Sequence, residues 1–164
     1  MSYPYTPSLY SEEHELFRQT FRRFIAAEME PNVDRWLENH DIEADFWRKA
    51  GDAGILGVDI PEEYGGPGGD FQHRIVLAEE LGYSVAGASM STALIGDGTS
   101  EILHRCGTEQ QRRRWLPSMV RGEARFGLAI TEPDTGSDVA SIRTTAVRDG
   151  NEWVIKGAKT YISN

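Results

Sequence analysis

Residues 130–138 read ITEPDTGSD and are the most informative stretch of this 164-residue sequence. Pro133 and Gly136 predict a rigid turn here, because proline fixes φ and glycine can adopt a positive φ. Ser137 and Asp138 can then offer backbone N–H groups and a hydroxyl, which suits a pyrophosphate or the polar edge of a heterocycle. From the residues alone, the alternative is an ordinary turn whose side chains satisfy only their own backbone.

A second informative segment is YISN, residues 161–164. Tyr161 and Ser163 are two positions apart, so in a strand they share one face. An aromatic plane beside a small hydroxyl can form the wall of a site for a flat, hydrogen-bonding cofactor. The alternative is a plain, half-buried edge strand.

Composition excludes several classes of function. The net charge of −9 argues against nucleic acid as the main partner. The single cysteine, Cys106, cannot form an internal disulfide and is expected to pack at a helix end. No apolar run is long enough to span a membrane, and the N-terminus resembles no targeting signal, so we expect a cytoplasmic protein. The four histidines show no ligand spacing, which predicts surface or helix-face residues and no metal site.

Helical signals occupy the first two-thirds of the chain. Ser11 is a good N-cap for a helix that Pro31 should end, and Asp70 should cap a later helix after a glycine-rich loop. Thr108 and Gln111 form a capping box. The expected helices begin near Ser11, Asp41, Asp70, Ala86 and Thr108, and the loop covers residues 55–70.

The pattern changes to alternation after Gly122. Apolar residues predict strands at 126–130, 142–148, 153–155 and 159–164, and Asp149-Gly150 is a strong hairpin signal. These few strands cannot close a barrel. We therefore expect an α+β chain with an all-α domain at residues 1–122 and the first strands of a β domain at residues 123–164.

Five segments in order carry a resemblance to a known family. They are the N-terminal amphipathic helix, IPEEYGG (60–66), GTEQQRRRWLPSMVRGE (107–123), ITEPDTGSD (130–138) and KGAKTYISN (156–164). The chain resembles the N-terminal helical domain and the start of the antiparallel middle β domain of acyl-CoA dehydrogenases. The resemblance implies that the β domain is truncated and that the family's C-terminal helical domain is absent.

The resemblance also implies an activity of fatty acid β-oxidation. The family uses FAD to oxidise an acyl-CoA thioester at Cα–Cβ to the trans-2-enoyl-CoA, while a glutamate removes the Cα proton. Residues implied to bind the cofactor are Leu128, Ile130, Thr131, Gly136, Ser137, Tyr161 and Ser163. Those implied to contact the substrate are Ser137 and Ser91. Many members carry Trp at the position of Tyr161 and Thr at that of Ser163, and both differences keep the chemical type.

No catalytic residue is expected within this sequence. The glutamate base of the family lies beyond the chain end, and Glu62, Glu63 and Glu132 are interpreted as structural. The resemblance implies an electron-transfer flavoprotein or similar acceptor, and a homodimer or homotetramer at full length. Two alternatives stay open, namely an acyl-CoA oxidase or flavin monooxygenase of the same fold, and a non-catalytic helical interaction module.

Overall fold

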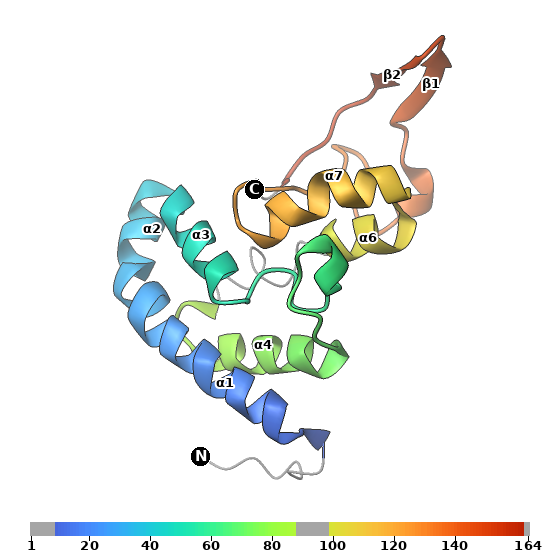
Figure 1. Cartoon of the computed structure of the whole chain (residues 1–164). Coiled ribbons are helices and arrows are strands. Elements are labelled where there is room, and N and C mark those ends of the chain that lie inside the picture. Colours follow the sequence, from blue (N-terminus) through green and yellow to red (C-terminus); the bar gives the residue numbers. More distant parts are fainter. Residues whose placement is uncertain (1–8, 88–98, 163–164) are drawn as a thin grey trace. The chain divides into compact units, whose positions relative to one another are not determined.

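The computed structural model describes residues 9–87 and 99–162 (Figure 1). It divides into two compact units, Met1–Phe126 and Gly127–Asn164. The first is helical and the second holds a small antiparallel sheet, so the expected fold class is confirmed. The finer division into domains 1–122 and 123–164 stays a prediction.

A long helical run opens the first unit. It consists of α1 Glu12–Phe24, a π-helical segment Ile25–Met29, a 3₁₀ segment Glu30–Asn32 and α2 Val33–Asn39. Ser11 caps α1 as expected, with its hydroxyl accepting from the backbone N–H of His14. The prediction that Pro31 ends the run is wrong. Pro31 lies in the first turn of the 3₁₀ segment, where a missing N–H costs no helical hydrogen bond, and the run continues to His40 in the left-handed conformation.

Two helices follow around the glycine-rich loop. Helix α3 spans Ala44–Asp52 and therefore begins later than the predicted start at Asp41. The loop contains one 3₁₀ turn, Glu62–Tyr64. Helix α4 spans Phe71–Tyr83, and Asp70 caps it as predicted. In Figure 1, α1 and α4 lie side by side, and they are the two helices in most extensive mutual contact within this unit.

The unit closes with α6 Thr99–Cys106 and α7 Glu109–Val120. The predicted capping box of Thr108 and Gln111 is confirmed. Much of the helix predicted from Ala86 lies outside the described residues. Gly122 follows α7 with φ +65°, and a Cβ there would lie 2.0 Å from the Trp47 carbonyl oxygen, so glycine is required for both conformation and space.

Two groups of buried side chains hold the unit together. The larger joins α1, α3, α4 and the loop after α3, with Phe21, Met29 and Ile55 fully buried. The smaller packs α7 against the 3₁₀ turn through Leu116 and Tyr64. None of the helices in the described part of the chain has the length and apolar character needed to cross a bilayer.

The sheet of the second unit is a single hairpin. Strand β1 Thr145–Asp149 pairs antiparallel with β2 Glu152–Lys156, and Asp149 faces Glu152 across the turn. The predicted hairpin is confirmed. The strands predicted at 126–130 and 159–164 are not present in the described residues, because apolar alternation fits a strand but a strand also needs a neighbour to hydrogen-bond.

Candidate functional site

Residues 130–138 form a turn closed by a reciprocal pair of backbone hydrogen bonds. The Glu132 N–H donates to the Thr135 carbonyl at 2.9 Å, and the Thr135 N–H donates to the Glu132 carbonyl at 3.1 Å. Pro133 and Asp134 occupy the exposed tip between them. Both bonded residues are buried, so their main chain is held where proline already restricts φ.

The carboxylate of Glu132 organises the segment that follows. It accepts from the backbone N–H of Arg143 at 2.8 Å and of Thr144 at 2.9 Å, one on each oxygen. The Thr144 hydroxyl, these N–H groups and Lys159 stabilise the ionised form and lower the pKa of Glu132 to about 2. The structural interpretation of Glu132 therefore fits its geometry.

Lys159 joins the turn to the segment after the hairpin. Its ammonium lies 3.0 Å from the Glu132 carboxylate and donates to the Ile130 carbonyl at 2.8 Å. The backbone N–H of Thr160 donates to the Thr131 carbonyl at 3.0 Å. We call these contacts of Glu132, Lys159 and Thr160 the Glu132–Lys159 clasp. It brings segments 130–132 and 159–160 together across 29 residues of sequence.

A short 3₁₀ turn, Val139–Ser141, completes the frame. The Ser141 hydroxyl donates to the Asp138 carboxylate at 2.5 Å, and the Thr135 hydroxyl donates to the Ser141 carbonyl at 3.3 Å. Asp138 is therefore engaged within its own turn. The hydroxyl of Ser137, by contrast, has no hydrogen-bond partner in the part of the chain that the structure describes.

The predicted cofactor-binding side chains lie on the exposed part of this frame. Leu128 and Ile130 are 39% and 40% exposed, and Ser137 is exposed. The side chain of Thr131 makes no hydrogen bond to any described residue. The clasp links Thr131 to the residue before Tyr161. Ser163 and Ser91 lie outside the described residues.

Two predicted details are wrong. Gly136 does not have a positive φ. A Cβ placed on it would meet no atom within 4 Å, so the space beside this residue is open. Tyr161 is not in a strand. Its φ is +56° and its side chain is 91% exposed, because the chain turns after the single hydrogen bond from Thr160.

The clasp itself was missed by reasoning from sequence. Glu132 and Lys159 are opposite charges on either side of a hairpin, which is a weak signal for an ion pair. The decisive acceptors are backbone carbonyls and the decisive donors are backbone N–H groups, and these leave no trace in residue types.

Two family models together match nearly the whole chain. The model described as "Acyl-CoA dehydrogenase, N-terminal domain" matches residues 11–123. The model described as "Acyl-CoA dehydrogenase, middle domain" matches residues 127–164.

Individual relatives agree with these matches. The chain is similar to the mitochondrial long-chain specific acyl-CoA dehydrogenase of Sus scrofa, with 35% identity over 95% of this chain and 36% of that protein. It resembles the crystal structure of an acyl-CoA dehydrogenase from Geobacillus kaustophilus, with 37% identity and a TM-score of 0.85 over 96% of this chain and 41% of that one. It also resembles a Bacillus anthracis acyl-CoA dehydrogenase complexed with FAD, with 35% identity and a TM-score of 0.85 over 98% of this chain and 28% of that one. The chain thus spans well under half the length of these relatives.

Proposed function

This chain belongs to the acyl-CoA dehydrogenase family, and from that premise we propose that it is part of an enzyme oxidising an acyl-CoA thioester at Cα–Cβ to the trans-2-enoyl-CoA. FAD, when bound, supplies the acceptor for the hydride that leaves Cβ. The complex of the Bacillus anthracis relative with FAD supports this cofactor. We propose an acyl-CoA substrate, an electron-transfer flavoprotein or similar acceptor, and a homodimer or homotetramer for the whole protein.

The observation that carries the proposal is a rigid frame presenting unpaired polar groups. The turn is held by the Glu132 carboxylate, the Lys159 ammonium and backbone groups, so the Thr131 and Ser137 hydroxyls are not consumed in holding it. Donors held in place before binding interact with a ligand at a smaller entropic cost.

These residues fit FAD in the following way. Leu128 and Ile130 offer apolar contact to the ring system, and the Thr131 hydroxyl lies on the same segment for its polar edge. The open space over Gly136 admits a bulky anion, and the Ser137 hydroxyl can donate to the pyrophosphate. We assign Tyr161 to the side of the ring system, and Ser163 to the flavin by the family resemblance. Ser137 and Ser91 are proposed to contact the substrate.

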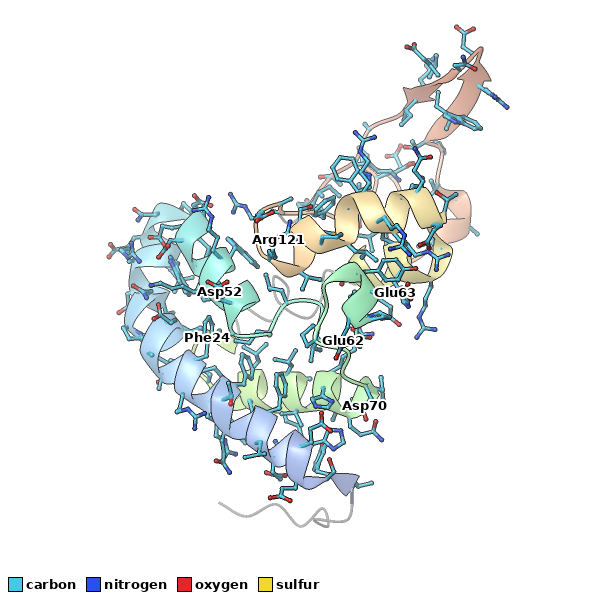
Figure 2. The ribbon with its side chains drawn as sticks, viewed as in Figure 1. Phe24, Asp52, Glu62, Glu63, Asp70 and Arg121 are labelled. Atoms are coloured by element: carbon cyan, nitrogen blue, oxygen red, sulfur yellow. The ribbon has the colours of Figure 1, made fainter. Side chains whose placement is uncertain are left out.

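The proton abstraction belongs to a group that we do not assign to this sequence. Glu132 is unsuited to it, because both carboxylate oxygens are engaged and its pKa of about 2 leaves a very weak base near neutral pH. Glu62 and Glu63 lie in the 3₁₀ turn of the helical unit (Figure 2). We therefore expect no dehydrogenation of acyl-CoA by the 164-residue chain with an artificial electron acceptor.

The test is a titration of FAD into the purified chain, followed by quenching of flavin fluorescence. Ser137→Ala should weaken binding by roughly 10- to 100-fold, since a hydrogen bond to a charged group contributes about 1.5–3 kcal/mol. Ser118→Ala is the control, because that hydroxyl is spent on the Trp115 carbonyl in α7. Equal affinity of both variants for FAD would refute the assigned role of Ser137. If neither the parent chain nor either variant binds FAD, the geometry of the turn no longer supports the proposal.

The oxidase and monooxygenase alternative has the same frame and needs a different measurement. Rapid reaction of the reduced full-length flavoprotein with oxygen would favour it, and a slow reaction would favour the dehydrogenase. The interaction-module alternative predicts that FAD does not bind at all.

A further inference from the structure

Two histidines and a carboxylate meet where helices α1 and α4 begin. His14 and His73 are 8% and 7% exposed, and their ring centroids are 4.4 Å apart. Asp70 lies at the start of α4 (Figure 2), and its side chain is 55% exposed. Its Oδ1 is 3.0 Å from His14 Nε2 and 2.8 Å from His73 Nδ1. One potential ligand atom from each residue lies within 4.8 Å of the other two. Both histidines lie on helices, as one of the two predicted placements has it, and their faces are buried instead of exposed.

Two neighbours of His73 require opposite hydrogen-bonding roles from the same ring nitrogen. His14 Nδ1 accepts from the Ser11 N–H at 2.9 Å, so its proton is on Nε2 and faces the Asp70 carboxylate at 3.0 Å. His73 Nδ1 is 3.2 Å from the Asp70 backbone nitrogen, whose N–H can donate only if Nδ1 has a free lone pair. The same Nδ1 is 2.8 Å from Asp70 Oδ1, to which it can donate only if it carries a proton. A neutral imidazole cannot meet both demands at one nitrogen. A cation bound to Nδ1 would use the His73 lone pair and balance the Asp70 carboxylate without a proton on that nitrogen, and the Asp70 N–H would then need solvent as its acceptor.

We propose that His14 Nε2, Asp70 and His73 Nδ1 form a zinc site that joins the starts of α1 and α4. Two imidazole nitrogens and one carboxylate are donors that Zn²⁺ accepts, with water completing the shell, whereas Mg²⁺ and Ca²⁺ prefer oxygen. Zinc ligands at tetrahedral angles lie about 3.3 Å apart. The 3.0 Å and 2.8 Å separations from Asp70 Oδ1 are close to that value, so small side-chain shifts suffice.

The surroundings provide the remaining requirements. Hydrogen bonds from His73 and His14 outweigh partial burial and lower the pKa of Asp70 to about 2, so the carboxylate is ionised at neutral pH. With zinc on Nε2, the His14 proton moves to Nδ1 and can be donated to the Ser11 hydroxyl, 2.9 Å away, which orients the ring. The Ser11 N–H then loses Nδ1 as its acceptor. The Asp70 side chain is 55% exposed, so water can reach the cluster from that side.

One feature opposes a cation here. The starts of α1 and α4 both carry the positive end of a helix dipole. Three glutamates in the first turn of α1 offset this, namely Glu12, Glu13 and Glu15. The inference concerns the helical unit alone and does not depend on flavin binding.

The chain itself suggests variants that remove the ligands and preserve the fold. His14 and His73 are the third residues of capping boxes, and the same position in the third box of this chain is Gln111. Glutamine therefore keeps the cap and removes the imidazole. His14→Gln and His73→Gln are the test variants. His40→Gln is the matched control, and Cys106→Ser in every form excludes binding by the exposed thiol.

The experiment titrates ZnCl₂ into the 164-residue chain by calorimetry. We expect one zinc per chain in the parent and in His40→Gln. In either test variant we expect a loss of affinity above about 100-fold, since changes to outer-shell partners alone cost 10- to 100-fold. The thermal midpoint should rise with zinc concentration only in the forms that bind.

A second measurement needs no variant. Long-range proton–nitrogen NMR of the parent should show zinc-induced shifts at His14 Nε2 and His73 Nδ1, and none at His40 or His104. Absence of one-to-one binding would overturn the proposal. So would binding that survives both glutamine variants, or ring shifts that pH changes reproduce and zinc does not.

Discussion

The ion-pair network between α1 and α4 offers the sharpest test of what stabilises the helical unit. Glu80 is 4% exposed and accepts from Arg18 at 2.8 Å and from Arg22 at 2.6 and 2.9 Å. Arg18 is itself buried. Removing one partner of a buried pair costs about 3–5 kcal/mol, because the other charge loses its compensation.

The expected loss for Glu80→Ala lies at the lower end of that range. Arg18 keeps the Glu79 carboxylate at 2.8 Å, and the Arg22 side chain is 60% exposed and can be rehydrated. We therefore expect a loss of about 3 kcal/mol in the free energy of unfolding. Glu80→Gln keeps the shape and an acceptor, and should lose about 1–2 kcal/mol.

Urea unfolding followed by tryptophan fluorescence measures this, since Trp36 and Trp47 are buried in the same unit. A loss of 3 kcal/mol lowers the urea midpoint by about 1–3 M for typical slopes. Glu123→Gln is the control, because its pair with Arg121 is more than half exposed on both sides and should leave the midpoint unchanged. Equal midpoints for Glu80→Ala and Glu123→Gln would refute the reasoning.

The same network sets a dependence on pH. Burial raises the pKa of Glu80, but hydrogen bonds from Arg22 and Arg18 more than offset this and hold it below its ordinary value of 4.5. A lowered pKa means that the folded form binds its proton less readily than the unfolded form. The stabilisation by Glu80 is complete above pH 4.5 and is lost as the pH falls through the lowered pKa. Glu80→Gln should therefore reduce the fall in the free energy of unfolding at acidic pH.

Three further outcomes are expected. Leu116→Ala, at a fully buried position, should cost about 2–5 kcal/mol in urea unfolding, while Leu16→Ala, at a 57% exposed position, should change little. Gly122→Ala should lower the free energy of unfolding more than Gly150→Ala does, because both glycines have a positive φ but a Cβ on Gly122 would also lie 2.0 Å from a carbonyl oxygen. Equal losses for the two variants would contradict this steric explanation. The Glu132 carboxylate should keep its hydrogen bonds from the Arg143 and Thr144 N–H groups until the pH approaches about 2, and NMR shifts of those two amides report this. Loss of these bonds near pH 4.5 would contradict the lowered pKa.

Local chemistry explains what could be predicted from sequence. The caps at Ser11, Asp70 and Thr108 depend on residues three apart, so their signals are complete within one turn of helix. The hairpin is equally local. Pro31 does not end the helical run, because proline stops a helix only where an N–H is needed, and the first turn of a new helical segment needs none.

Non-local contacts explain what was missed. The alternation at residues 126–130 reports side-chain faces and says nothing of a partner strand. His14 and Asp70 are 56 residues apart in sequence, and only the packing of α1 on α4 brings them together. The same holds for Lys159 and its acceptors on the turn. The candidate flavin-binding residues came from a family resemblance, which carries three-dimensional information that periodicity lacks.

The β1–β2 hairpin has a practical consequence for handling this protein. Every residue of both strands is exposed, including Val147, Trp153, Val154 and Ile155. A two-stranded ribbon with apolar side chains on its surface and unsatisfied outer backbone groups is a template for adding strands from other molecules. The 164-residue chain should therefore self-associate as its concentration rises, and charged replacements at Val147 and Ile155 should suppress this self-association without disturbing the helical unit.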